Sequence, residues 1–391
     1  MTANGATGGA EAIAVAEAAA ARSPRPAPRF DWFVPIDGDG EHIGTTAAER
    51  PPTFDYLRMV VETAEAEGFD ALLIPTRFSN GLFDEAAPLA ETWTTATALA
   101  TVTSRIRFLV AVRPGYVTPG LLAQMASTLA NFSGGRLDLN VVPGGIQGDV
   151  ERLGEHASHD QRYRRAEELI EACRLLWEQP APVDYHGETV RLQRALVSPP
   201  PPPPGPRFYL GGASDAALTL AGRQADQLLA WIQPREVIAH LLTRARLEFA
   251  VADRPAEFGL RTHLVLRDTE EAAWTAAEEL LARAEDSVKA QRRSQVVGTP
   301  MVGGRAQAHG FEGHRVTERL WNGIAEVRVN LGTAIVGTPE QAAEELLSYW
   351  RLGIDEFILS GFPHVEECRR TAEELLPLLR EAIEHERATA R

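Results

Sequence analysis

An arginine and a histidine lie two residues apart inside an apolar segment. The segment FGLRTHLVLR spans residues 258–267 and is typical of a strand, so Arg261 and His263 are expected to share one face. Breaking the partnership of a buried cation costs about 3–5 kcal/mol, so we expect a polar cavity here rather than a core. There a cation stabilises negative charge and an imidazole orients a substrate or relays a proton. A structural ion pair, or a strand edge open to water, is the alternative.

A second candidate is the segment GGASDAA at 211–217. Two glycines end a strand, and Ala213 and Ser214 begin a helix. The free backbone N–H groups after Gly212, together with the Ser214 hydroxyl, are suited to a phosphate. A plain N-cap role for Ser214 explains the same pattern.

Two further strands carry small or polar residues near their ends. Asn140 and Val142 share a face of the strand 137–142, and Asn140 points to the interior or mouth of the fold. Its amide is suited to a ligand or to a water network. Ala111, near the end of the strand 106–112, leaves room for a flat ring.

The sequence lacks an evident nucleophile or metal site. It has two cysteines, Cys173 and Cys368, both in expected helices, and no CxxC or HExxH motif. The glycines of GDGEHIG at 38–44 imitate a dinucleotide fingerprint, but the spacing and the following prolines exclude it. A phosphate loop and a cationic pair without a nucleophile indicate that a cofactor performs the chemistry.

These residues must be positioned by an alternation of strands and helices. The expected strands are 30–35, 71–75, 106–112, 137–142, 207–212, 227–232, 258–267 and 356–361. The expected helices are 54–67, 92–103, 119–132, 161–178, 214–224, 234–251, 270–290 and 366–384, with Thr53 and Thr118-Pro119 opening two of them. Eight such units predict an α/β fold, a (β/α)8 TIM barrel, in one domain from 30 to 385. A doubly wound sheet is the competing fold.

Three stretches do not follow the alternation. Residues 1–29 are rich in Ala, Gly and Pro, and we expect a disordered or loosely helical tail. Residues 180–206 predict a hairpin followed by six extended, exposed prolines. The insertion 291–335 is expected to act as an active-site lid or an oligomer contact.

Composition excludes some partners. The chain has 391 residues, a net charge of −15 and a pI near 5.2, which argue against nucleic acid or an anionic membrane as the main partner. No convincing signal peptide precedes the first strand, so a cytoplasmic location is expected.

Several segments in this order resemble the bacterial-luciferase-like flavin monooxygenases, and among them the alkanesulfonate monooxygenases. The resemblance covers roughly 30–385. It rests on FDWFVPIDGDGEHIGT, ALLIPT, RIRFLVAVRPG, GGRLDLNVVPGG, RYRRAEE, YLGGASDAA, FGLRTHLVLR, LGTAIVG and GIDEFILSGFPHVEE. It implies a barrel enzyme that uses O2 and reduced FMN (FMNH2). A separate NAD(P)H:FMN reductase would supply the FMNH2, and the enzyme would form a homodimer or homotetramer.

The resemblance also implies roles for single residues. Arg261 and His263 match a catalytic pair beside the flavin. Residues matching cofactor contacts are Thr76, Ala111, Asn140, Val142, Tyr163, Gly212, Ala213 and Ser214. Residues expected at the substrate are Trp32, Asp37, Trp231 and Phe362.

The chain departs from the alkanesulfonate enzymes on the substrate side. Asp37 stands where they carry a histidine, Phe362 where they carry a tyrosine, and their cysteine after the second strand has no counterpart. Their lid arginine aligns with Phe311, and Arg305 or Arg315 would replace it after a shift. A carboxylate in place of a cation should weaken an anion pocket.

The resemblance therefore implies an FMNH2-dependent monooxygenase acting on a small organic substrate. An alkanesulfonate or related organosulfur compound, cleaved to an aldehyde and sulfite, is the favoured substrate. An oxidoreductase of the same fold that uses deazaflavin F420, and a flavin-binding homologue without turnover, are the alternatives.

Overall fold

The computed structural model describes residues 3–21, 25, 27–145, 151–296, 314–328, 330 and 332–389. Eight parallel strands close into a barrel in the order β1-β13-β9-β8-β7-β4-β3-β2. They are β1 (Arg29–Phe33), β2 (Ala71–Ile74), β3 (Arg107–Val112), β4 (Leu137–Val141), β7 (Phe208–Gly211), β8 (Gln227–Trp231), β9 (Phe258–Arg261) and β13 (Glu356–Leu359). The predicted barrel is confirmed, and each of the eight expected strands contributes one barrel strand.

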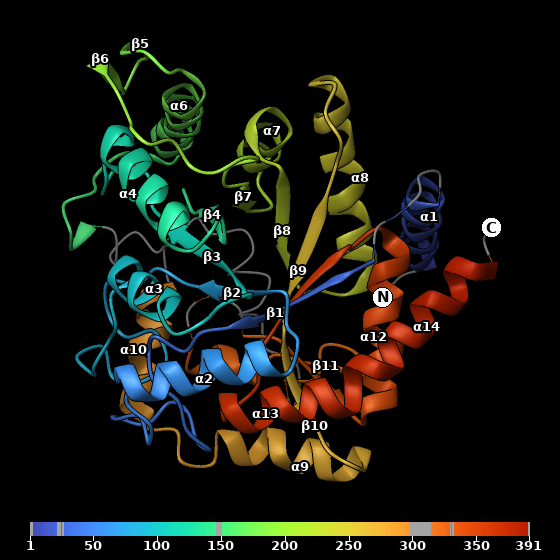
Figure 1. The fold of residues 1–391 in the computed structure, drawn as a ribbon. Helices are drawn as coiled ribbons and strands as arrows, with labels where there is room; N and C mark the ends of the chain where they lie inside the picture. Colours follow the sequence, from blue (N-terminus) through green and yellow to red (C-terminus); the bar gives the residue numbers. More distant parts are fainter. Residues whose placement is uncertain are drawn as a thin grey trace.

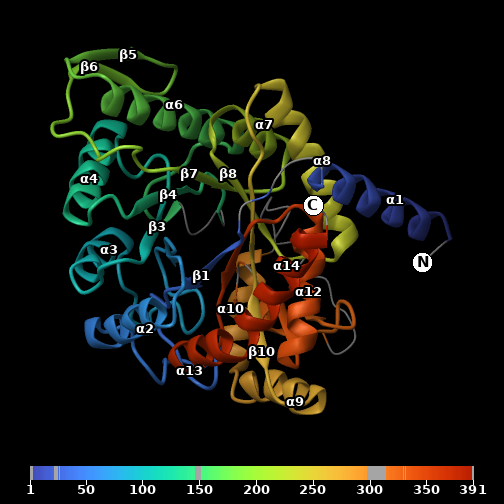
Figure 2. The same ribbon diagram turned by 45° about the vertical axis from the view of Figure 1, so that its right-hand side comes forward.

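Helices cover the outer face of the barrel, as Figures 1 and 2 show. They are α2 (Phe54–Ala66), α3 (Thr92–Ala100), α4 (Pro119–Phe132), α6 (His159–Glu178), α7 (Asp215–Gln224), α8 (Arg235–Val251), α12 (Pro339–Leu352), α13 (His364–Arg370) and α14 (Leu376–Thr389), with a π-helical turn at Thr371–Leu375. Two expected starts are confirmed, because Thr53 and Thr118 accept hydrogen bonds from the amides of Tyr56 and Leu121.

The barrel interior is built in layers. At the amino ends of the strands, Arg107 pairs with Asp138 at 2.9 Å and Arg29 pairs with Glu356. Above them lies an apolar layer from six strands, formed by Phe33, Leu73, Leu109, Tyr209, Leu229 and Ile358. The two layers fill the lower barrel, so a ligand has room only at the carboxyl ends of the strands, where barrel active sites form.

The segment 258–267 is not one strand, which corrects the sequence prediction. The chain leaves the barrel at Thr262, whose amide still donates to Ile358 O at 3.0 Å. The next amide, of His263, donates to Thr333 O instead. From there β10 (His263–Leu266) joins a separate three-stranded sheet with β11 (Leu320–Trp321) and β12 (Ala334–Gly337).

Other segments also differ from expectation. The helix predicted at 270–290 is two helices, α9 (Glu270–Leu280) and α10 (Asp286–Val296), and α12 was not predicted. The expected hairpin is confirmed as β5 (Val183–His186) with β6 (Arg191–Ala195). The proline run lies outside helices and strands, but Pro201 within it is buried.

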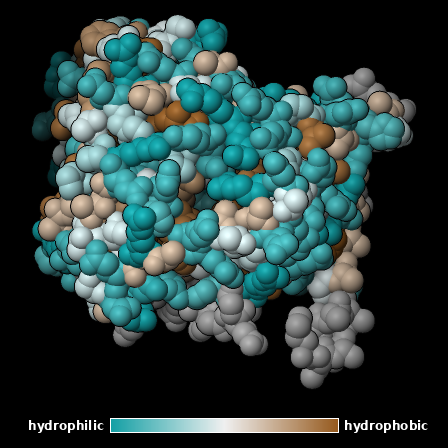
Figure 3. Space-filling view, turned by 90° about the horizontal axis from the view of Figure 1, so that it is seen from below, coloured by the Kyte–Doolittle hydropathy of each residue, from teal (hydrophilic) through white to brown (hydrophobic). Residues whose placement is uncertain are grey.

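The amino-terminal segment is helical from Ala3 to Ala20 and forms α1. Figures 1 and 2 show α1 alongside α8, and Ala12 and Ala16 are buried. The face of the molecule in Figure 3 is mostly hydrophilic, and its hydrophobic residues lie scattered over it. Among the described helices, none combines the length and apolar character needed to cross a membrane.

Candidate active site

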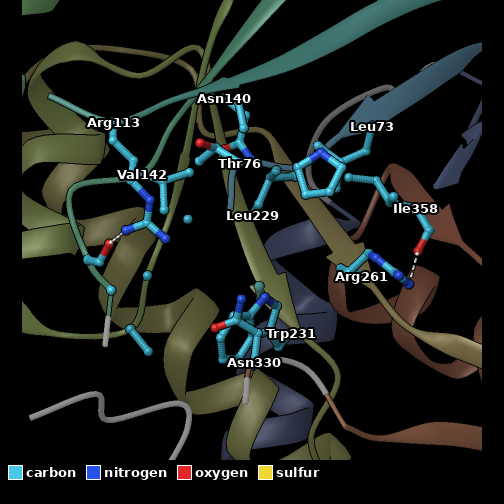
Figure 4. Close-up of a pocket in the computed structure, with 18 of the residues that line it drawn as sticks. Leu73, Thr76, Arg113, Asn140, Val142, Leu229, Trp231, Arg261, Asn330 and Ile358 are labelled. Carbon is cyan, nitrogen blue, oxygen red and sulfur yellow. Dashed lines mark hydrogen bonds between the residues drawn. The ribbon is translucent and has the colours of Figure 1, made fainter. Parts of the chain in front are cut away.

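A cavity of about 230 Å³ opens at the carboxyl ends of the barrel strands. Figure 4 shows residues from different strands and loops converging on it. Ten of the residues predicted for the site line this cavity: Thr76, Ala111, Asn140, Val142, Tyr163, Gly212, Ala213, Ser214, Trp231 and Arg261. The roles expected for them remain predictions.

One end of the cavity is formed by the turn from β7 into α7. Ser214 is the N-cap of α7, and its hydroxyl accepts from the amide of Ala217 at 3.3 Å. Gly212 has φ +156°, and a Cβ there would lie 2.6 Å from the Ala217 Cβ and 3.4 Å from the Tyr163 hydroxyl. The turn therefore needs glycine for a close approach. Burial raises the pKa of Tyr163, so its hydroxyl stays a hydrogen-bond donor at neutral pH.

The other end of the cavity carries Arg261. Its side chain is only 4% exposed and stacks over Phe33, with the guanidinium carbon 4.4 Å from the ring centre. The guanidinium donates to the main-chain oxygen of Thr262, to Ile358 O at 3.5 Å and to Ser360 Oγ at 2.9 Å. Within the part of the chain that the structure describes, the acceptors of this guanidinium are thus two main-chain oxygens and a hydroxyl, and none is a carboxylate.

Two cavity arginines that the sequence analysis did not name lie near Arg261. Burial, and then the neighbouring Arg328 and Arg77, lower the pKa of Arg261 well below its usual range. Burial, and then Arg77, lower the pKa of Arg328 to about 9. Arg113 and Arg162 also line the cavity, so among the described residues five arginines and no carboxylate face it. The cavity is therefore suited to anions.

Arg77 was detectable from sequence, whereas Arg328 was not. Arg77 comes three residues after the end of β2 and so belongs to the loops at the strand ends that form the site. Arg328 lies in the insertion 291–335, where no periodic pattern predicts which way a side chain points.

Asp37 does not line the cavity but lies behind Arg77. One carboxylate oxygen accepts from the amide of Gly81 at 2.8 Å, and the other is 3.6 Å from Arg77 Nε. Asp37 is therefore not a lining residue of the cavity, and its expected role at the substrate stays a prediction. In the structure it supports a cation of the cavity.

Trp32 and Phe362, which were predicted at the substrate, also lie outside the cavity. Trp32 is fully buried on the outer face of β1, with its ring 5.2 Å from that of Phe69. Its placement at the substrate is wrong, because the alternation of β1 turns Phe33 and not Trp32 to the interior. Phe362 is buried and stacks on His263, with ring centres 5.5 Å apart.

His263 does not share the cavity face with Arg261, which corrects the prediction. It begins β10, is 1% exposed and does not line the cavity. Its Nδ1 lies 2.7 Å from Ser360 Oγ, the same oxygen that accepts from Arg261. The two predicted residues are therefore connected through a serine that the sequence analysis did not single out.

Of the three positions considered for a lid arginine, the structure describes one. Arg305 and Phe311 lie outside the described residues. Arg315 is exposed and stacks over Trp274, with the guanidinium carbon 3.7 Å from the ring centre. Among the described residues of the insertion, Arg328 and Asn330 line the cavity instead.

The described residues offer neither a metal centre nor a reactive thiol. No group of three or more His, Cys, Asp or Glu residues among them is arranged to hold a metal ion. Cys173 and Cys368 are buried, and burial raises the pKa of each thiol.

Residues 29–356 match the model of a protein family described as luciferase-like monooxygenase. The chain belongs to this family. The match covers seven barrel strands completely and reaches the first residue of the eighth.

Solved structures share the fold. The long-chain alkane monooxygenase LadA superposes with a TM-score of 0.74 at 18% identity, over 92% of this chain and 92% of that one. The EDTA monooxygenase EmoA from Chelativorans sp. BNC1 has a TM-score of 0.69 at 17% identity, over 91% and 94%. An F420-dependent secondary alcohol dehydrogenase has a TM-score of 0.65 at 17% identity, over 90% and 99%. Two proteins named as monooxygenases and one named as an F420-dependent dehydrogenase thus share this fold.

Proposed function

We propose that this protein is an FMNH2-dependent monooxygenase that oxidises an alkanesulfonate or a related organosulfur compound. For a sulfonate, the C–S bond breaks and a C=O bond forms. One oxygen atom of O2 enters the aldehyde and the other leaves as water. The two electrons and two hydrogens come from the reduced flavin, and the sulfur leaves as bisulfite.

The cavity residues fit FMN. The close approach at Gly212, the free amides at the start of α7 and the hydroxyls of Ser214 and Tyr163 form a cradle for its phosphate. Residues for the ring and ribityl chain are Thr76, Ala111, Asn140 and Val142. When bound as FMNH2, the cofactor supplies the reducing equivalents with which O2 is activated.

The arginines fit an anionic substrate. The phosphate cradle binds the negative charge of the FMN phosphate. Arg261, Arg328 and Arg77 line the cavity separately from it, and Asp37 is the carboxylate that pairs with Arg77. Guanidinium groups bind planar or tetrahedral oxyanions through several N–H donors. A sulfonate placed among them offsets the repulsion of the three cations.

Arg261 has a second role in this proposal. Its guanidinium is buried and held by three oxygen acceptors, so it is oriented before the substrate enters. A preorganised cation in a site shielded from water stabilises charge that develops on the reacting oxygen. The apolar layer beneath, with Phe33 and Ile358, keeps water from the lower side.

The observation that carries the proposal is the combination of a phosphate cradle and a cluster of arginines around one cavity, among whose described lining residues there is no carboxylate. The purified protein would be mixed with photoreduced FMN and air-saturated buffer. Sulfite release would be measured with a series of alkanesulfonates, and O2 consumption with a broad panel of organosulfur compounds. We expect substrate-dependent product formation. No turnover across the panel, with reduced FMN demonstrably bound, would contradict the substrate assignment.

A matched pair of variants separates catalysis from binding. Arg261→Ala should depress turnover at least tenfold more than it weakens FMNH2 binding, because Arg261 lies away from the phosphate cradle. Arg315→Ala, an exposed arginine outside the cavity, is the control and should change neither. Equal losses of turnover and flavin affinity in Arg261→Ala would make it a binding residue only.

F420 is the second candidate cofactor, favoured by the structural similarity to an F420-dependent alcohol dehydrogenase. F420 transfers hydride and needs no O2. Parallel titrations with FMN and F420, each followed by fluorescence, distinguish the two. Tighter F420 binding with O2-independent oxidation of an alcohol would replace the oxygenase proposal.

We also propose that a separate reductase supplies the flavin. The protein alone should not oxidise NADH or NADPH in the presence of FMN, and an added NAD(P)H:FMN reductase should restore turnover. Pyridine-nucleotide oxidation by the isolated protein would contradict this. A homodimer or homotetramer is the expected assembly, which light scattering of the purified protein tests.

A further inference from the structure

Ser360 occupies the junction at which the chain leaves the barrel. It follows β13 directly, is fully buried, and its main-chain oxygen accepts from the amide of Leu264 at 2.7 Å. Its side chain thereby lies between the end of β9 and the start of β10. A hydroxyl in this position contacts both residues of the predicted catalytic pair.

The contacts form a chain. Arg261 Nη2 lies 2.9 Å from Ser360 Oγ, and Ser360 Oγ lies 2.7 Å from His263 Nδ1. The three side chains are at most 4% exposed. Of these three residues, Arg261 is the one that lines the cavity, and Ser360 connects it to His263.

The chemistry of the three groups fixes the direction of the chain. A guanidinium only donates, so Ser360 Oγ accepts from Arg261. The hydroxyl carries a single proton, and among the described residues His263 Nδ1 is the acceptor within reach of it. His263 Nδ1 is then unprotonated, and the ring is neutral with its proton on Nε2.

Charged groups lie on both sides of His263. On the cavity side, Arg261 is adjacent, with Arg328 and Arg77 beyond it. On the other side, His263 stacks on Phe362, whose ring also contacts His364, and His364 pairs with Asp39 at 3.1 Å. Further along, β10 packs against α9 and α13, and Arg267 after β10 pairs with Glu367 of α13 at 3.0 Å. The charged group joined to His263 through Ser360 is therefore the Arg261 cation, whereas the carboxylate of Asp39 lies beyond Phe362 and His364.

We propose that Ser360 is a positioning residue, whose hydroxyl aims the Arg261 guanidinium at the cavity and holds His263 in its neutral Nε2–H tautomer. The inference rests on the proposed function only for its effect on turnover. The tautomer itself follows from the contacts and is measurable in the protein without cofactor or substrate.

The first test is made on the unaltered protein. Long-range ¹H–¹⁵N spectra of protein labelled with ¹⁵N-histidine report the tautomer of each ring, and His263→Gln assigns the signal among the ten histidines. We expect the His263 signal of a neutral ring protonated at Nε2 at pH 7.5. A ring protonated at Nδ1 would overturn the proposal without any variant.

Variants then separate the hydroxyl from its position. Ser360→Ala should lose the tautomer preference and lower kcat/KM by at least tenfold, and Ser360→Thr should restore both. Thr262→Val is the matched control, because Thr262 is equally buried and its hydroxyl donates only to the main-chain oxygen of His263 at 3.0 Å. A folded Ser360→Ala protein with an unchanged His263 signal would refute the proposal. The expected tautomer together with no turnover in any form would refute the proposed function alone.

Discussion

Replacing Arg328 with methionine should stabilise the protein while impairing its function. Arg328 is 5% exposed, its Nε has no partner among the described residues, and burial and Arg77 lower its pKa from the usual range of an arginine to about 9. The folded protein holds the Arg328 proton less tightly than the unfolded chain does. The resulting penalty is complete below about pH 9 and is relieved as the pH rises from there toward the usual pKa of an arginine.

The magnitude follows from this difference in pKa. At about 1.4 kcal/mol for each pH unit, the penalty has an upper bound of about 5 kcal/mol. Replacing a buried charge by an apolar side chain of similar size stabilises proteins by about 1–4 kcal/mol. Methionine keeps most of the packing over Phe33, so we expect a gain of about 1–3 kcal/mol at neutral pH.

The assay is urea unfolding at pH 7.5, without cofactor, paired with the KM for the sulfonate. We expect a higher free energy of unfolding and a KM raised at least tenfold, because a cation of the proposed anion site is lost. Arg315→Met, in the same insertion but exposed, should change neither quantity. A destabilised Arg328→Met protein, or one with an unchanged KM, would refute the electrostatic reasoning.

Three further variants test other parts of the structure. Gly212→Val should weaken FMN binding by at least tenfold, because the valine side chain collides with Ala217. Gly211→Ala is the control and should bind FMN normally, because a Cβ at that position meets no atom within 4 Å. Equal affinities of the two variants in fluorescence titrations would contradict the phosphate cradle. Burial, and then Glu356, raise the pKa of Asp31 well above its usual range, so the folded protein keeps a proton that the unfolded chain releases above about pH 4. This group therefore lowers the free energy of unfolding as pH rises. We expect the free energy of unfolding of Asp31→Asn, relative to that of the unaltered protein, to increase between pH 4.5 and 7 by up to about 1.4 kcal/mol per pH unit. A difference that stays constant over this range in urea unfolding would contradict the prediction. Trp32→Phe should cost about 1–3 kcal/mol of stability yet leave KM unchanged, because its ring packs on the outer face of β1; a raised KM would return it to the substrate site.

The barrel was predictable because each strand is short, apolar and bounded by recognisable turns. The start of α12 carried a signal too, since Thr338 and Gln341 form a capping box in the structure. That pattern is visible in the sequence as Thr-x-x-Gln, with Pro339 at the first helical position. The sequence therefore contains the signal that predicts α12.

The site was predictable where the side chain lies on one barrel strand, and less so elsewhere. Arg261, Asn140 and Ala111 reach the cavity because the alternation of faces holds within a strand. The same rule failed for His263, because at Thr262 the chain exchanges one hydrogen-bonding neighbour for another. That exchange depends on the distant Thr333, which no local pattern indicates.

The most direct test of the account compares two ligands that differ by a phosphate. Anaerobic titration of the protein with FMNH2 and with reduced riboflavin measures what the turn at Gly212–Ser214 contributes. We expect FMNH2 to bind at least tenfold more tightly, since the free amides of α7 and the Ser214 hydroxyl bind the phosphate. Equal affinities for the two reduced flavins, or binding of neither, would contradict it.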